Sequence, residues 1–222
     1  MPFNQRKNHT LLILFILIIL FNASGSFAQK LSMAEAKHAG DSIIPEAILP
    51  FWQSLTLKEK VAQTLMVYMP SASYIKKHQF GGVLIMKPHL KDTLHLKEEL
   101  SLANESLKIP LLTAIDQEGG QVNRLQAISP EWKNLPSAKE MRTMTDDSVY
   151  NLAKQIGNEL HHYGINLNLA PVLDPPKDSK GKPSFIEVSN RSFGEFETAV
   201  PKIRSFVKGM KESKVLSTSK HF

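Results

Sequence analysis

The amino-acid sequence predicts a parallel α/β fold. Short apolar segments of strand length alternate along the chain with segments whose apolar residues recur at helical spacing. Acidic residues directly follow two of the apolar segments, at Asp116 and Asp174. The carboxyl ends of parallel strands lie together, and α/β proteins bind ligands there. Asp116 is therefore the first candidate for a ligand contact, although an Asp that only hydrogen-bonds its own turn would look the same in the sequence.

The first 28 residues have the pattern of a secretory signal peptide. Arg6 and Lys7 precede an unbroken apolar run over residues 11–21, and small residues then lead to Ala28. The pattern predicts cleavage after Ala28 and export to the periplasm or medium of a bacterium. The apolar run is shorter than a membrane-spanning helix, so no stable membrane anchor is expected. Residues 29–50 are predicted to form a lead-in to a domain over 51–222.

The composition excludes several classes of protein. Of 222 residues, 42% are hydrophobic and 22% are charged, as in ordinary globular proteins. The net charge of +6 falls to +4 once Arg6 and Lys7 leave with the signal peptide. Lysines are spread along the chain rather than clustered with aromatic residues, so we expect no nucleic-acid partner. There is no cysteine, hence neither a disulfide nor a lipid-modified cysteine.

The segment from residue 56 to 115 predicts two helices and three strands. Thr56 and Glu59 have the spacing of a capping box and predict the start of a short helix. Asp92 can cap a second helix that runs through Leu107. An apolar segment predicts a first strand at 64–69, and continuous apolar runs predict buried strands at 81–86 and 111–115.

The segment after residue 145 predicts two longer helices and two more strands. Residues 146–163 carry an apolar stripe, which Gly164 ends. A strand is predicted at 165–173, and an irregular polar loop follows it. The second helix is predicted at 197–213, with Pro201 in its first turn, and the last strand at 215–219. His161 and His162 are interpreted as surface residues in a last helical turn rather than as metal ligands, because no partner ligand stands at zinc spacing.

The order of these elements favours a (β/α)₈ barrel of the TIM type over an open doubly wound sheet, although periodicity alone leaves both open. The chain holds about the first five strands of such a barrel, which usually needs about 250 residues. No glycine-rich phosphate loop follows the first strand, which argues against a nucleotide site.

Four motifs together resemble the N-terminal domain of family 3 glycoside hydrolases. They are Asp116 to Gly120 with Arg124, Gly164 to Asp174, Asn190 to Gly194, and Lys220 to Phe222. The Asp-x-Glu-Gly-Gly loop is most similar to that of bacterial β-N-acetylhexosaminidases. The resemblance covers roughly residues 50–222, and four motifs in this order make it specific.

The resemblance implies a barrel enzyme that hydrolyses terminal β-linked sugars with retention of configuration, acting on amino-sugar glycans such as cell-wall fragments. It implies substrate-binding roles for Asp116, Arg124, Arg191, Lys220 and His221. Asp116 would accept hydrogen bonds from sugar hydroxyls, and the other four would donate them. From spacing alone, both arginines could instead brace loops through backbone carbonyls.

Other positions carry weaker expectations. Glu118 is expected to hold its own loop in place, and Asp174 to fix the turn that precedes two prolines. The sequence departs from the family pattern at Gln121, where the hexosaminidase branch usually has arginine, and in the loop 175–188, which is longer than usual.

No catalytic residue is predicted within the chain. In the family, Lys-His-Phe opens a longer motif whose later His and Asp form the acid/base pair, and the nucleophilic Asp follows later still. Both are expected beyond Phe222, and the fragment alone is expected to be inactive. No metal or organic cofactor is implied, and nothing indicates the oligomeric state. Two alternatives stay open: a family 3 β-glucosidase, or a non-catalytic carbohydrate-binding remnant if the chain really ends at Phe222.

Overall fold

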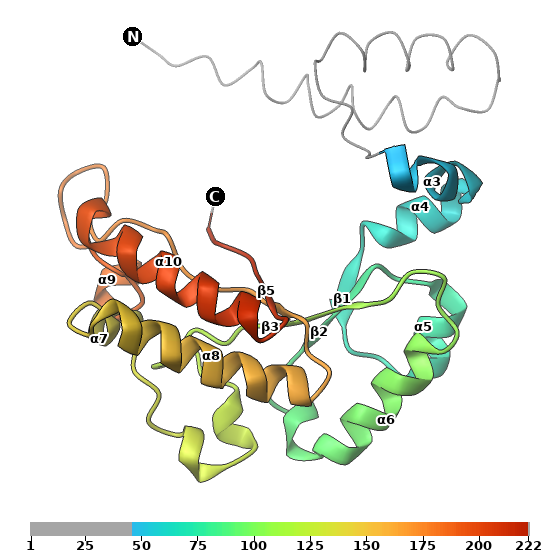
Figure 1. Ribbon diagram of the computed structural model, residues 1–222, viewed down its shortest axis with the longest axis horizontal. Coiled ribbons are helices and arrows are strands. Elements are labelled where there is room, and N and C mark those ends of the chain that lie inside the picture. The colour runs from blue at the N-terminus through green and yellow to red at the C-terminus, as the bar shows by residue number, and fades with distance from the viewer. Residues whose placement is uncertain (1–45, 222) are drawn as a thin grey trace, which may run out of the picture. The chain divides into compact units, whose positions relative to one another are not determined.

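The computed structural model describes residues 46–221 (Figure 1). The predicted signal peptide and most of the lead-in lie outside these residues. The chain divides into two compact units between Thr56 and Leu57. The described part of the first unit is the 3₁₀-helix η1 (Glu46–Ile48) followed by helix α3 (Leu49–Ser54). Pro50 stands in the first turn of α3, where its missing N–H leaves no helical hydrogen bond unmade.

The second unit is built on a five-stranded parallel sheet. Its strands are β1 (Met66–Tyr68), β2 (Gly82–Ile85), β3 (Leu112–Ile115), β4 (Leu167–Asn168) and β5 (Leu216–Ser217). They lie side by side in sequence order, and every neighbouring pair is parallel. This order confirms the predicted partial barrel, because an open doubly wound sheet reverses its strand order at a switch point.

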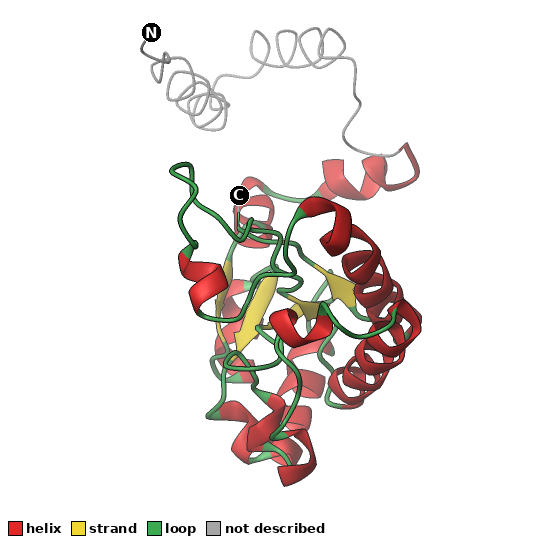
Figure 2. Cartoon of the chain, turned by 90° about the vertical axis from the view of Figure 1, so that its left-hand side faces the viewer, coloured by secondary structure: helices red, strands yellow, loops and turns green. Residues whose placement is uncertain are grey.

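Helices connect the strands and surround the sheet (Figure 2). They are α4 (Leu57–Gln63), α5 (Ala72–His78), η2 (His89–Lys91), α6 (Thr93–Asn104), η3 (Leu125–Ala127), η4 (Pro130–Trp132), α7 (Ala138–Met141), α8 (Asp146–His162), α9 (Phe185–Val188) and α10 (Phe196–Glu212). The three longest, α6, α8 and α10, match the predicted helices closely. Asp92 caps α6 by accepting a hydrogen bond from the amide of His95 at 3.0 Å.

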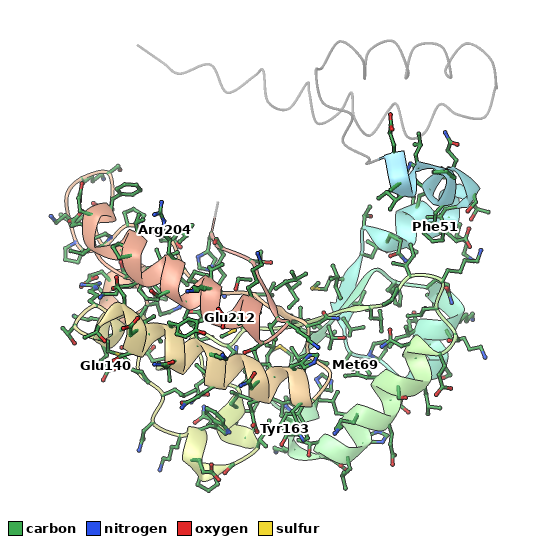
Figure 3. The ribbon with its side chains drawn as sticks, in the orientation of Figure 1. Phe51, Met69, Glu140, Tyr163, Arg204 and Glu212 are labelled. Carbon is green, nitrogen blue, oxygen red and sulfur yellow. The ribbon has the colours of Figure 1, made fainter. Side chains whose placement is uncertain are left out.

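Helices α8 and α10 lie side by side (Figure 1) and approach each other through glycines. A Cβ atom on Gly209 would lie 2.5 Å from the carbonyl oxygen of Tyr150, so a larger residue would force the helices apart. At the end of α10, Glu212 lies next to α8 (Figure 3), where it bonds the hydroxyl of Tyr150 and pairs with Lys154 at 3.3 Å. The buried stripe of α10, which includes Phe206 and Met210, covers the sheet as its spacing predicts.

Two predicted elements differ from the structure. The fourth strand was predicted at 165–173, but its ladder covers only β4, and the amide of Leu169 makes one further bond to the Ile115 carbonyl at 2.8 Å. Val172 then rejoins the sheet through a parallel bridge to Lys220. Pro201 lies in the second turn of α10 rather than the first, at an exposed position.

Helices α5, α7 and α9 were not predicted, since one or two turns leave little periodicity to detect. Within residues 46–221, no helix is both long enough and apolar enough to cross a membrane.

Candidate functional site

Asp116 follows β3 directly and lies at the carboxyl edge of the sheet, as predicted. The next residue ties this edge to the neighbouring strand. The backbone amide of Gln117 donates to the side-chain oxygen of Asn168 at 3.0 Å, and the amide nitrogen of Asn168 donates to the Gln117 carbonyl at 2.8 Å. Both side chains are fully buried. Asn168 therefore fixes the point at which the chain leaves β3.

The side chain of Gln117 folds the rest of the loop back onto that point. Its oxygen accepts hydrogen bonds from the amides of Arg124 at 2.7 Å and Leu125 at 3.0 Å. The chain reverses direction between Gln117 and Arg124, and this turn needs a residue in the left-handed region. Gly119 provides it with φ +94°. A Cβ atom there would lie 2.2 Å from the carbonyl oxygen of Pro136. The backbone of Arg124 is thus held by the side chain of Gln117.

A cluster of two carboxylates and two cations forms the centre of the site. The guanidinium of Arg191 donates to both oxygens of Glu118, each at 2.8 Å. The ammonium group of Lys220 lies 2.6 Å from an oxygen of Glu118 and 2.6 Å from an oxygen of Asp116. We call Asp116, Glu118, Arg191 and Lys220 the charged cluster. It joins the ends of β3 and β5 with the loop that follows α9.

The charged cluster is largely shielded from water. The side chain of Glu118 is only 6% exposed, and those of Lys220 and Arg191 are 17% and 18% exposed. The hydrogen bonds to Glu118 raise the pKa of Arg191 above its usual value, although burial opposes the shift. Charge-assisted bonds in such surroundings are strong and hold the side chains in one arrangement. Glu118 was predicted to hold its own loop in place. Its carboxylate instead bonds Arg191, after α9, and Lys220, after β5.

Arg124 stands apart from the ion pairs. Its buried Nε atom has no hydrogen-bond partner within residues 46–221. Buried donors are nearly always satisfied, so one without a partner calls for an explanation.

His221 is bound to Asp174 rather than to the charged cluster. Its Nδ1 atom lies 2.7 Å from Oδ2 of Asp174, and its backbone amide donates to the same oxygen at 3.0 Å. Burial acts to raise the pKa of Asp174, but these two bonds outweigh it and leave the pKa lowered. The carboxylate of Asp174 thus reaches across to the segment after β5, beyond the turn that it was predicted to fix.

The predicted site residues thus converge on one edge of the sheet. Asp116, Arg191 and Lys220 belong to the charged cluster, His221 follows Lys220, and Arg124 is held by the loop after β3. Gln117 and Asn168 were missed. The alternation Asn-Leu-Asn-Leu over 166–169 could have identified Asn168, since it places amides on one face of a strand. The part of the chain that the structure describes contains no group of three or more His, Asp or Glu residues placed to bind a metal.

Enzymes with a (β/α)₈ barrel have their active sites at the carboxyl ends of the parallel strands. The five parallel strands and the charged cluster at their carboxyl ends place this chain in that class. Residues 56–222 match the model of the glycosyl hydrolase family 3 N-terminal domain. The chain belongs to this family, as the four motifs predicted.

Curated relatives and solved structures agree with this assignment. Beta-hexosaminidase A of Pseudoalteromonas piscicida is 34% identical over 157 residues, which are 67% of this chain and 25% of that protein. Beta-hexosaminidase LpqI of Mycobacterium tuberculosis is 29% identical over 182 residues, 76% of this chain and 43% of that protein. The chain therefore spans between a quarter and a half of the length of these relatives.

Two solved structures share the fold. Mycobacterium tuberculosis LpqI aligns with a TM-score of 0.67 and 29% identity over 79% of this chain and 50% of that one. The beta-N-acetylhexosaminidase of Beutenbergia cavernae aligns with a TM-score of 0.64 and 27% identity over 76% of this chain and 54% of that one.

Proposed function

We propose that this chain supplies the sugar-binding part of a retaining β-N-acetylhexosaminidase, which releases terminal β-linked N-acetylglucosamine from glycans. The charged cluster at the carboxyl edge of the sheet carries the proposal. Sugar hydroxyls both donate and accept hydrogen bonds, and the cluster offers carboxylate acceptors and cationic donors within a few ångströms of each other. The names of the curated relatives support the same activity.

Asp116 is proposed to accept hydrogen bonds from substrate hydroxyls. Its carboxylate has about four lone-pair sites, and the bond from Lys220 occupies only one of them. Lys220 and Arg191 would donate to the same sugar, held in place by Glu118. Arg124 is proposed to donate through the other nitrogens of its guanidinium, because its Nε is itself buried. A fixed array of this kind aligns the glycosidic bond for reaction.

A retaining mechanism needs one carboxylate as nucleophile and a second group as acid and then base. We assign neither role to a residue of this chain. Asp116 is paired with Lys220 at 2.6 Å, which suits a group that orients the sugar. The acid/base pair is proposed to lie in the longer motif that Lys220 to Phe222 open, and the nucleophile later still in the full-length protein.

The enzyme is proposed to act outside the cytoplasm. The signal-peptide pattern over residues 1–28 supports this, and amino-sugar polymers such as cell-wall fragments are the glycans that an exported bacterial enzyme of this kind meets.

The test compares two chromogenic substrates with the full-length protein. We expect kcat/KM for 4-nitrophenyl N-acetyl-β-D-glucosaminide to exceed that for the corresponding β-D-glucoside by about a hundredfold or more. A site that binds the 2-acetamido group through hydrogen bonds rejects an analogue that lacks this group. NMR of the released sugar should show the β-anomer first. Preference for the glucoside would indicate a β-glucosidase instead, and hydrolysis of neither substrate would support a non-catalytic carbohydrate-binding protein.

A further inference from the structure

The contact between Asp174 and His221 lies outside the charged cluster and joins the segments that follow β4 and β5. Two nitrogen atoms of one residue, the backbone amide and the imidazole Nδ1 of His221, converge on a single oxygen of Asp174. Both backbones are fixed as well. The amide of Leu173 donates to the carbonyl of Lys220 at 2.7 Å, and the hydroxyl of Ser192 donates to the carbonyl of Asp174 at 3.3 Å. The contact is therefore held on both sides.

The geometry determines which imidazole nitrogen carries the hydrogen. An imidazole nitrogen and a carboxylate oxygen 2.7 Å apart need one hydrogen between them. Oδ2 already accepts the backbone amide of His221 and belongs to a carboxyl group whose pKa is lowered, so Asp174 is ionised at neutral pH. The hydrogen therefore resides on Nδ1 of His221. In the neutral imidazole, Nε2 then has a free lone pair and can only accept.

We propose that Asp174 is a positioning residue that fixes His221 in the Nδ1–H tautomer, so that Nε2 accepts a hydrogen bond from a substrate hydroxyl. The inference deepens the proposed function and rests on it for the identity of the ligand. It reverses the expected role of His221, which the family resemblance cast as a donor. The His221 side chain is 48% exposed, so a ligand can reach the ring.

An acceptor at this position complements the other groups of the site. Arg124, Arg191 and Lys220 can only donate, so a hydroxyl that faces them acts as acceptor. A second acceptor besides Asp116 allows the site to bind hydroxyls that donate in two directions. A substituent that accepts but cannot donate, such as fluorine, would lose the bond to Nε2 while keeping its contacts with the cations.

The first experiment measures the tautomer directly in the full-length protein. Imidazole ¹⁵N NMR at neutral pH, with the signal assigned by comparison with His221→Ala, should show Nδ1 protonated and Nε2 unprotonated. In Asp174→Ala the Nε2–H form should become the major one, as in free histidine. The exposed carboxylate of Asp147 provides the control, and Asp147→Ala should leave the spectrum unchanged. A wild-type Nδ1 that carries no hydrogen overturns the proposal, whether or not the Asp174 variant folds.

The second experiment identifies the partner of Nε2. Binding is measured for N-acetylglucosamine and for its 3-, 4- and 6-fluoro analogues. One analogue should bind the wild type about tenfold more weakly, a factor that corresponds to about 1.4 kcal/mol. This loss should disappear in His221→Ala and shrink in Asp174→Ala. A loss of equal size in His221→Ala would overturn the acceptor role.

The two failures are distinguishable. If the wild type binds no sugar of the panel, the proposed function and the acceptor role both fail, while the NMR result still decides whether Asp174 fixes the tautomer.

Discussion

Glu118 illustrates how one side chain can organise a site. Its carboxylate is almost fully removed from water, which costs free energy unless the charge is paired. Two bonds from Arg191 and one from Lys220 provide that pairing. The same bonds restrain two long cationic side chains that would otherwise sample many rotamers. Glu118 thus determines the positions of the groups that are proposed to bind the sugar.

Glu118→Gln tests this role at the scale of one residue. The amide keeps the shape but removes the charge, so Arg191 and Lys220 lose their shared partner. We expect the free energy of unfolding in urea to fall by about 3 kcal/mol, because Arg191 loses its carboxylate partner in largely buried surroundings, while Lys220 keeps only Asp116. Sugar binding should weaken as well. The matched change Glu98→Gln, at an exposed position of α6, should alter stability by less than about 0.5 kcal/mol. Equal effects of the two changes would contradict the role given to Glu118.

Individual residues were predicted better than their contacts. The motifs identified Asp116, Arg191, Lys220 and His221, all of which lie at one edge of the sheet. They could not show that Glu118 bonds Arg191, 73 positions away, because that contact depends on where the loops after β3 and α9 meet. The link between Asp174 and His221 was missed for the same reason.

Short elements form the rim of the site and depend on tertiary contacts. Arg142, at the end of α7, donates to the carbonyl of Ser192 at 2.9 Å and pairs with Glu187 of α9. Helix α7 begins with a capping box in which Ser137 and Glu140 bond each other's backbone; Figure 3 labels Glu140. One-turn helices are not stable alone, so Arg142 is expected to hold this rim together.

The pairing of Glu187 makes rim stability depend on pH. Hydrogen bonds from Arg142 lower the pKa of Glu187, although partial burial opposes the shift. A carboxyl group with a lowered folded-state pKa stabilises the protein above its unfolded-state pKa, near 4.3, and loses this contribution as the pH falls through the folded-state value. Glu187→Gln should therefore lower the free energy of unfolding by about 1 kcal/mol at pH 7 and by much less at pH 3. A difference independent of pH would contradict this account.

Long elements were predicted well because periodicity accumulates over several turns. The seventeen-residue helix α8 differs from its prediction by one residue at its end, where Gly164 adopts φ +77°. The four-residue helices α7 and α9 gave no such signal. The ladder of β4 could not be predicted from its apolar run, because hydrogen bonding depends on the neighbouring strands.

Across the whole molecule, strand order brings the site together. Asp116 and Lys220 are separated by 104 positions, yet they meet because β3, β4 and β5 are consecutive neighbours and their carboxyl ends coincide. Alternation of strands and helices predicted a parallel α/β sheet from the sequence, but by itself it left the barrel and the doubly wound strand order both open. The family resemblance was still needed to indicate a carbohydrate ligand, since the fold alone supports many chemistries.

The charged cluster is proposed to bind a terminal sugar, and Asp116 to orient that sugar without being the nucleophile. Calorimetric titration of the full-length protein with N-acetylglucosamine tests the binding claim, and mass spectrometry of a trapped glycosyl-enzyme tests the second part. We predict that Asp116→Ala weakens binding at least about tenfold, that Asp147→Ala does not, and that the covalent intermediate still forms in Asp116→Ala. Unchanged affinity in Asp116→Ala, or attachment of the sugar to Asp116 itself, would contradict the claim.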